Sequence, residues 1–476
     1  MKTPKLKVGL CGIGLAAYWD QFAGLRERLE GYVHSVAGRL AAQKDTEIIH
    51  LGLIDSTARA REAGHAFRRA DIDLLFLYVT TYALSSTVLP LVQKAGVPVI
   101  VLNLQPDAAI DYISFNQMKD RTAMTGEWLA WCSSCPVPEI ANVLVRAKIP
   151  FHQVVGLLQD TDTWREIEEW LTAARIRASL ENNRLGLMGH YYSGMLDIMT
   201  DVTQLCITFG GDVEILEVDE LSALREQVAE NAVRTCISDF HAHFEVQPDC
   251  PAEELHRAAR TSVALDHFVA KHQLTSLAYY YKGTGVPANE DTMSSIILGT
   301  SLLTARHVPV AGEYEVKNVI AMKMLDAMDA GGSFTEYYAV DYKEDVVLMG
   351  HDGPGHIAIS QGRTKVRPLQ VYHGKVGRGL SVEMSVKYGP VTLLSVVEDP
   401  SGGFQLLTAE GESVPGAVLE IGNTNSRYHF PIGARKFLAE WNAHGPAHHC
   451  AVGTGHVTPV LKKLAFLLGI GLHQVC

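Results

Sequence analysis

The sequence contains no run of about 20 apolar residues, the length a helix needs to cross a bilayer, so no membrane-spanning segment is expected. Basic residues are not in excess either, because 41 Lys and Arg stand against 53 Asp and Glu, for a net charge of -12. An acidic chain of this kind is a poor partner for nucleic acid or an anionic membrane. Long low-complexity tracts and short-period repeats are also absent. We therefore expect a globular protein that acts on a small molecule.

Cysteine is sparse and scattered. Of the eight cysteines, only Cys132 and Cys135 form a CxxC pair. A single CxxC, without a second pair or a nearby histidine cluster, is weak evidence for a zinc or redox site, so we expect reduced thiols. The first 19 residues superficially resemble a secretory signal, but glycines interrupt their apolar run and a helical pattern follows instead of a cleavage site. We expect a cytoplasmic location.

Strand-like and helical patterns alternate over the first third of the chain. This alternation is typical of an open parallel α/β sheet of Rossmann-like or flavodoxin-like type. A second α/β segment begins near Leu185, and from about Gly332 the chain is rich in strands that read as hairpins of a barrel or sandwich. We predict an α/β fold of three domains, 1–178, 179–331 and 332–476. The strand candidates of the first domain are residues 7–11, 47–54, 72–79 and 97–102.

The most informative stretch is 311–356. Apolar residues at three- and four-residue intervals predict an amphipathic helix over about 316–328, which Gly331 and Gly332 then end. A period-two pattern follows and puts Glu336 on the apolar face of a strand, where a carboxylate is costly unless it is paired or bound to a metal. If Lys343 and Glu344 formed a two-residue hairpin loop, Glu336 would lie opposite His351, with Cβ atoms roughly 5 Å apart.

Each candidate ligand also has an ordinary structural explanation. Glu313 precedes a helix, where an acidic residue complements the helix dipole. Glu336 would face solvent if its strand lay on an open surface, and His351 would be an ordinary turn histidine. Their convergence, next to a tight loop rich in glycine and proline, favours a divalent-metal site. The loop residues are Gly350, Gly353, Pro354 and Gly355.

A fourth ligand is expected in the segment 444–456. It contains His448 and His449, and adjacent histidines rarely both reach one ion. One of them would bind, and the other would orient its neighbour or contact solvent. Two glutamates and two histidines form an oxygen and nitrogen set that suits Mn²⁺, with Co²⁺, Mg²⁺ or Zn²⁺ possible.

The order AGE, helix, GGSFTE, DVVLMGH and GPAHH resembles the L-arabinose isomerase family and, more distantly, L-fucose isomerase-like proteins. The resemblance implies that Glu313, Glu336, His351 and His449 bind the metal, and that Glu313 and Glu336 are also the catalytic acid/base pair. It implies a Mn²⁺-dependent aldose–ketose isomerase, an intramolecular oxidoreductase of carbohydrate metabolism. It further implies a homo-oligomer, a trimer or hexamer, in which neighbours complete the active site.

Departures from the family concern the sugar pocket. The family's Gln-His pair after the first strand is replaced by Gly12-Ile13-Gly14-Leu15, and its substrate-facing His-Gly-Gly by Met124-Thr125-Gly126. The metal chemistry thus looks retained and the pocket rebuilt, so a sugar other than L-arabinose is expected.

Other functions compete with the isomerase. Gly12, Gly14 and Ala17 fit GxGxxA, a dinucleotide-binding fingerprint, and Asp55 ends the second strand as a ribose-binding acid would. That acid lies 43 residues after Gly12, however, where about 20 are expected. An NAD-dependent oxidoreductase is therefore an alternative, as are a sugar-binding or sensing protein with a degenerate site and a metal-dependent hydrolase or aldolase.

Overall fold

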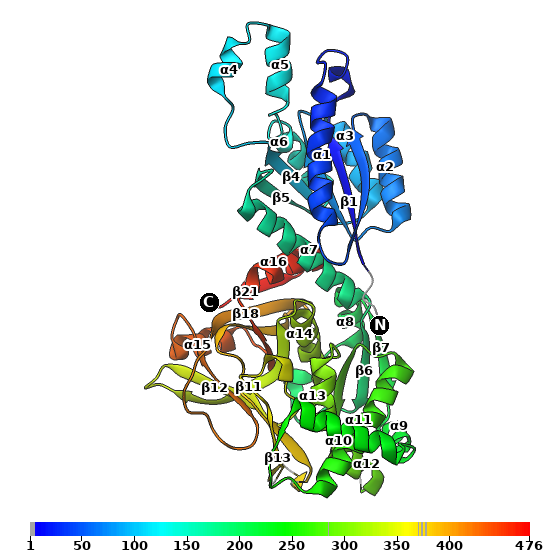
Figure 1. Ribbon diagram of the computed structural model, residues 1–476, viewed down its shortest axis with the longest axis vertical. Coiled ribbons are helices and arrows are strands. Elements are labelled where there is room, and N and C mark those ends of the chain that lie inside the picture. The colour runs from blue at the N-terminus through cyan, green and yellow to red at the C-terminus, as the bar shows by residue number, and fades with distance from the viewer. Residues whose placement is uncertain (1–4, 284, 370, 373–374, 377) are drawn as a thin grey trace. The chain divides into compact units, whose positions relative to one another are not determined.

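The computed structural model describes residues 5–283, 285–369, 371–372, 375–376 and 378–476 (Figure 1). The chain divides into two compact units, Met1–Ala178 and Ser179–Cys476. The first unit is a five-stranded sheet in the order β2-β1-β3-β4-β5, with every pair parallel. Its strands are β1 (Leu6–Ile13), β2 (Thr46–Ile54), β3 (Leu74–Val79), β4 (Val99–Gln105) and β5 (Phe151–Leu157).

Helices connect these parallel strands, as parallel pairing requires. The central strand β3 reads LLFLYV and is buried at every position, which is typical of a strand covered on both faces. The open parallel sheet expected for this part of the chain is confirmed. The helices are η1 (Ala16–Tyr18), α1 (Leu25–Ala41), α2 (Thr57–Ala70), α3 (Ser85–Ala95), α4 (Tyr112–Gln117), α5 (Arg121–Leu129), α6 (Val137–Arg146) and α7 (Thr161–Glu181).

The second unit begins with another parallel sheet, in the order β10-β9-β6-β7. Its strands are β6 (Arg184–Gly189), β7 (Asp212–Leu216), β9 (Ser276–Tyr280) and β10 (Val310–Ala311). The helices of this part are η2 (Leu196–Ile198), α8 (Val202–Phe209), α9 (Val218–Glu226), α10 (Glu230–His243), α11 (Ala252–His272), α12 (Pro287–Met293), α13 (Ile297–Ala305) and α14 (Val316–Asp326).

An antiparallel barrel follows in the same unit. Six strands pair in the order β17-β20-β11-β12-β19-β18, and pairing of β18 with β17 closes the ring. Of the barrel and the sandwich that the strand-rich pattern allowed, the structure has the barrel. Its strands are β11 (Gly331–Asp341), β12 (Val346–His351), β17 (Gly389–Glu398), β18 (Phe404–Ser413), β19 (Thr424–His429) and β20 (Cys450–Thr454), and β21 (Gly471–Gln474) adds in parallel to β18.

Smaller elements complete the second unit. The short strand β8 (Glu245–Val246) pairs with β13 (Lys365–Pro368), which also pairs with β16 (Leu380–Glu383), and β14 (Val371–Tyr372) pairs with β15 (Lys375–Val376). The remaining helices are η3 (Ile357–Ile359), α15 (Ala434–Ala443) and α16 (Thr458–Leu468). The division of this unit at 331/332 and the Rossmann-like assignment stay predictions.

Helix α14 differs from the amphipathic helix that its periodicity predicts. It is buried at all of its positions, Lys317, Lys323 and Asp326 included. It contacts β9 and β10 of the parallel sheet as well as β11, β17 and β20 of the barrel. A helix covered on all sides needs no solvent-facing stripe, and its polar residues are retained because they have partners. The Lys323 ammonium, for example, donates to the backbone oxygen of Thr275 at 3.2 Å.

Among the described residues, no helix combines the length and apolar character that crossing a membrane demands.

Candidate metal centre

The turn between β10 and α14 presents Glu313. Both Glu313 and Tyr314 adopt left-handed backbone conformations, with φ of 55° and 62°. Such conformations cost of order 1–3 kcal/mol for residues other than glycine and persist where the surroundings enforce them, often at functional sites. Here the backbone N–H of Tyr314 donates to the oxygen of Tyr279 at 3.0 Å, and that of Glu315 to Gly312 at 3.0 Å. From this strained turn the Glu313 side chain reaches His351 and His449.

Strands β11 and β12 bring Glu336 and His351 into the same region, but not in the predicted register. Pairing follows the predicted register from Asp341 opposite Val346 to Ala339 opposite Leu348, and then a bulge shifts it by one residue. Glu336 therefore lies opposite Gly350, and the predicted pairing with His351 is wrong. A bulge leaves one residue of the strand unpaired and re-aims the side chains beyond it.

His449 is the most enclosed of the candidates. It directly precedes β20, its residue is 1% exposed, and its ring stacks on Phe334 with centroids 4.4 Å apart. Its Nε2 lies 3.5 Å from Oε2 of Glu313 and 3.9 Å from Oε2 of Glu336. The Nε2 of His351 lies 3.9 Å from Oε1 of Glu313. The structure thus brings all four predicted side chains together, although they are separated by up to 136 residues in the sequence, from Glu313 to His449.

Two overlapping groups of side chains have the geometry to hold a cation. In each group, one ligand atom per residue lies within 4.8 Å of the others. Both groups contain His449, so they describe one centre with two arrangements of donors. The groups are Glu313, His351 and His449, and Glu336, His448 and His449.

The donors fit a divalent ion chemically. Neither ring nitrogen of buried His449 has a hydrogen-bond partner among the described residues, a costly arrangement that a bound cation would relieve. The backbone N–H of Gly353 donates to Nδ1 of His351 at 3.0 Å. The neutral His351 ring therefore carries its proton on Nε2 and must release or move it when an ion binds there. Imidazole nitrogens combined with carboxylate oxygens suit Mn²⁺ and its neighbours.

Burial and the closeness of other carboxylates raise the pKa values of the acids at the centre. Burial, and then the charges of Glu336 and Asp352, raise the pKa of Glu313 to about 7. Burial likewise raises the pKa of Glu315 to about 8. The pKa of His449 lies well below its usual value, chiefly through burial and then through His351 and His448. A cation would offset the crowding of the carboxylates, and His449 is already neutral, as a ligand must be.

His448 occupies a different position from its neighbour. Its side chain is 51% exposed, and its Nε2 makes a close ion pair with Oε2 of Glu336. Its backbone N–H donates to Oδ2 of Asp197 at 2.8 Å. The hydrogen bond with Glu336 is the main cause of the raised pKa of His448. His449 is thus enclosed while His448 faces the pocket, and both nevertheless belong to the group with Glu336 that could hold a cation.

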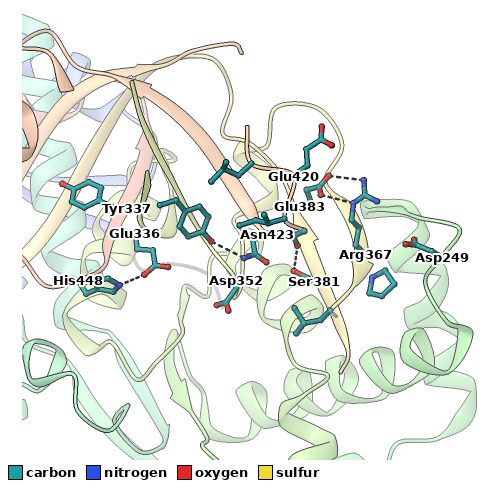
Figure 2. A pocket seen from close by; sticks show the side chains of 16 residues that line it. Asp249, Glu336, Tyr337, Asp352, Arg367, Ser381, Glu383, Glu420, Asn423 and His448 are labelled. Atoms are coloured by element: carbon teal, nitrogen blue, oxygen red, sulfur yellow. Dashed lines mark hydrogen bonds and ion pairs between the residues drawn. The ribbon is translucent and has the colours of Figure 1, made fainter. Parts of the chain in front are cut away.

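A pocket of about 1070 Å³ adjoins the centre (Figure 2). In Figure 2, Glu336, His448 and Asp352 lie at one end, and Arg367, Glu383 and Asp249 lie at the other. Asn423 lies between the two ends, and its side-chain amide donates to the phenol oxygen of Tyr338 at 3.4 Å. Of the residues that the structure describes, five carboxylates line the pocket with one guanidinium, that of Arg367, which Glu383 pairs at 2.9 Å. The acids are Asp249, Glu336, Asp352, Glu383 and Glu420.

The proteins that are similar in sequence to this chain include L-arabinose isomerases. An L-arabinose isomerase from Shewanella sp. (strain ANA-3) is 22% identical over 343 residues, covering 67% of this chain and 65% of the relative. One from Nocardioides sp. is 24% identical over 358 residues, covering 71% and 68%. The chain is a distant relative of L-arabinose isomerases. It spans about 65% of the length of the Shewanella relative.

The other comparisons add little. No known protein-family model matches the chain. An ABC transporter solute-binding protein from Burkholderia multivorans is 14% identical, covering 64% of this chain and 97% of that one, with a TM-score of 0.18. A periplasmic binding protein from Burkholderia mallei is 12% identical, covering 70% and 67%, with a TM-score of 0.15. Likeness this low carries no argument about fold or function.

Sequence reasoning missed three acids around the centre. Glu315 is fully buried, and its Oε2 lies 3.6 Å from Nδ1 of His449. The Oδ1 of Asp352 lies 3.5 Å from Nδ1 of His351, and Asp197 accepts from the backbone of His448. Glu315 and Asp352 could have been suspected from the sequence, because they lie two residues after Glu313 and one residue after His351. Asp197 belongs to a distant segment, and no pattern in the sequence links it to the centre.

The glycine-rich turn of the first unit does not have the geometry of a dinucleotide site. Ala17 lies in the short η1, and α1 begins only at Leu25, so the expected helix does not open at the turn. Asp55, the candidate ribose-binding acid, is 7% exposed and accepts from Nε1 of Trp19 at 2.8 Å. Gly12 is explained by packing, because a Cβ there would come within 2.5 Å of Val33 on α1.

The pair Cys132 and Cys135 also differs from expectation. The two are joined by a disulfide, so the predicted reduced thiols are wrong at these positions.

Proposed function

We propose that this protein is a metal-dependent aldose–ketose isomerase that interconverts a free aldose and its ketose. The proposal is supported chiefly by one observation, the convergence of Glu313, Glu336, His351 and His449. These side chains also follow the order of the motifs that resemble L-arabinose isomerases, to which the chain is distantly related.

The four side chains would hold Mn²⁺, with Co²⁺ or Mg²⁺ as possible substitutes. When bound, the ion would act as a Lewis acid on the carbonyl and neighbouring hydroxyl oxygens of the sugar. Histidine 351 and His449 would contribute neutral nitrogens, and Glu313 and Glu336 would contribute oxygens. Activity should fall at acid pH, because protonation of these four groups removes their ability to bind.

Proton transfer between C2 and C1 of the sugar is assigned to the pair Glu313 and Glu336. Because both carboxylates are also proposed ligands, the one that transfers the proton must bind the ion loosely or act through water. Glu336 is paired with His448, which faces the pocket and offers a route for exchange with solvent. Solvent deuterium at C1 of the product would exclude a pure hydride shift between the two carbons.

The lining of the pocket narrows the substrate class. Among the described lining residues, five carboxylates outnumber the cationic groups, the paired Arg367 and His448, and would repel phosphorylated and acidic sugars, so an uncharged aldose is the better substrate. The volume of about 1070 Å³ slightly exceeds the range of roughly 300–1,000 Å³ that holds drug-sized ligands. The pocket has room for more than a single pentose, which agrees with the proposal that L-arabinose is not the substrate.

The test is an assay of ketose formation with a panel of uncharged pentoses, hexoses and deoxy sugars, and their phosphates as controls. Metal-stripped protein should be inactive, and added Mn²⁺ should restore conversion of at least one uncharged sugar. No conversion of any sugar by protein that demonstrably holds Mn²⁺ would refute the isomerase.

A sugar-binding protein with a degenerate site is the second candidate, favoured by the replaced pocket residues at 12–15 and 124–126. It predicts that a sugar binds to the metal-loaded protein without turnover, which calorimetry would detect in the same panel. We also propose a cytoplasmic location, a homo-oligomer and a division into three domains. These proposals rest on the N-terminal sequence, the family resemblance and the pattern of strands and helices, respectively.

A further inference from the structure

We propose that Cys132 and Cys135 form a redox-active site in the first unit, which exchanges electrons with dithiols. The disulfide lies in the turn between α5 and α6, with a Cα–Cα distance of 5.4 Å. All eight cysteines lie in the described part of the chain, and this pair alone is joined. The site is separate from the residues of the metal centre, all of which belong to the second unit.

The turn is attached to the end of the parallel sheet. The side-chain amide of Gln105, the last residue of β4, donates to the backbone oxygen of Trp131 at 3.1 Å and to Oγ of Ser133 at 2.9 Å. The amide oxygen of Asn103 accepts from Oγ of Ser134 at 2.9 Å. The carboxyl end of a parallel sheet is where α/β proteins place their reactive groups. These bonds do not involve sulfur, so the turn can keep its shape in both redox states.

The two sulfurs have unequal surroundings. Cys132 is 2% exposed and packs in an apolar cluster with Leu25, Leu29 and Leu129, whereas Cys135 is exposed. Cys135 also lies two residues before the first residue of α6, at the positive end of the helix dipole, which favours a thiolate. An incoming thiol can reach Cys135 alone, and Cys132 is placed to resolve the product.

Stabilisation does not explain this disulfide well. The two cysteines are separated by 3 positions, and a loop this short removes little freedom from the unfolded chain. The remaining cysteines are free thiols, so the pairing is confined to the one position where the turn brings two sulfurs together.

The exchange balances in two steps. A thiolate of the dithiol attacks Sγ of Cys135, a new S–S bond forms, and the bond to Cys132 breaks with its electron pair left on Cys132, which takes up a proton. The second thiol then attacks the donor's own sulfur and releases Cys135 as a thiol. The dithiol is oxidised to a cyclic disulfide, and the protein pair gains two electrons and two protons.

The first experiment measures the redox state of the full-length protein in native buffer. The protein is incubated with dihydrolipoamide, or with a reduced redoxin protein in a parallel arm, then alkylated with iodoacetamide and weighed by mass spectrometry. We expect two further cysteines to become alkylated after reduction, and oxidation to reverse the gain. The two arms separate small-molecule dithiols from protein dithiols as donors. Reduction that requires denaturant would overturn the proposal and identify a structural cross-link.

Two variants sharpen the test. Cys132→Ser should trap a mixed disulfide on Cys135 with added glutathione disulfide, while Cys250→Ser, which removes a half-buried thiol of the second unit, should behave as the unaltered protein. Trp131 adjoins the pair, so its fluorescence should change on reduction and Trp131→Phe should abolish that change. A Cys132→Ser protein that folds but forms no mixed disulfide would contradict the proposal. If that variant does not fold, the alkylation of the unaltered protein decides alone.

Discussion

Glu313 and Glu336 both approach His449, although Glu313 lies in a strained turn and Glu336 in a barrel strand. Oε2 of Glu313 is 3.5 Å from Nε2 of His449, and Oε2 of Glu336 is 3.9 Å from it. Glu336 also contacts His448 and lines the pocket, whereas Glu313 is not among the described residues that line the pocket. Glu336 is therefore the carboxylate that a sugar in the pocket would meet first.

Replacing Glu336 with Gln should remove the carboxylate without changing the volume of the side chain. We expect kcat/KM to fall by at least about 100-fold, the contribution typical of a general acid or base. The thermal transition should stay close to that of the unaltered protein. Glu383→Gln is the matched control, since Glu383 lines the same pocket at the far end, beside Arg367. A fully active Glu336→Gln variant would remove this residue from the mechanism.

Glu315 is expected to affect metal binding indirectly, through His449. It is fully buried, it has no hydrogen-bond partner among the described residues, and it lies 3.6 Å from Nδ1 of His449. A carboxylate behind a ligating histidine fixes the ring and its proton, and losing such a partner typically weakens metal affinity by roughly 10- to 100-fold. Glu315→Leu should therefore bind Mn²⁺ more weakly by about that factor.

Calorimetric titration of metal-stripped protein measures this affinity. The control is Glu440→Gln, on the exposed side of α15. Glu315→Gln, which keeps an acceptor oxygen, should recover part of the affinity. Equal affinity in the Leu variant and the unaltered protein would show that Glu315 does not support His449.

The hydrophobic pattern of the sequence predicts the presence of β11, β12 and α14, but not their register or their full burial. The alternation in residues 334–342 correctly predicts a strand, and the hairpin partner in β12 is also correct. The bulge near Tyr338 leaves no mark in the pattern, because an extra residue keeps the local composition while shifting the faces. Likewise, the periodicity of α14 marks a helix but cannot reveal that a second layer covers its polar side.

The loop between β12 and η3 carries a buried histidine with a consequence for stability. Neither ring nitrogen of His356 has a hydrogen-bond partner among the described residues, and the residue is 5% exposed. Burial, then the charges of His307 and Lys387, lower its pKa from the usual 6.5 to about 4. The fold therefore favours the neutral ring. Its contribution to stability is complete above pH 6.5 and is lost as the pH falls through about 4.

The expected cost of acidification at this one site is about 3 kcal/mol, from a pKa difference between 6.5 and about 4. His356→Leu should show a shallower loss of thermal stability between pH 6.5 and pH 4 than the unaltered protein. Differential scanning calorimetry at a series of pH values measures it. His241→Gln, an exposed histidine on α10, is the control and should follow the unaltered protein. Parallel pH profiles for His356→Leu and the unaltered protein would contradict the prediction.

For the whole molecule, the alternation of strands and helices was enough to predict parallel α/β sheets followed by a β-rich part. Hydrophobic periodicity reports local burial, which is why it succeeds at this level. The meeting of Glu313 with His449 is not local, and only the resemblance to a family joined them beforehand. Asp197 had neither a periodic pattern nor a motif from the resemblance to identify it, and the CxxC spacing of Cys132 and Cys135 did not distinguish a disulfide from reduced thiols.

All candidate ligands belong to the second unit, so metal binding should protect that unit selectively. An ion that binds the folded state stabilises it by about 2.7 kcal/mol at 100 times its dissociation constant. Hydrogen exchange should therefore be slower with Mn²⁺ than without it in peptides that cover 311–356 and 447–454, which contain the candidate ligands and the paired strands β11, β12 and β20. Peptides of the first-unit sheet, within 6–157, should be unchanged. The triple variant of Glu336, His351 and His449, each replaced by Ala, should lose the protection. Protection confined to the first unit, with Mn²⁺ bound, would place the ion elsewhere and refute the assigned centre.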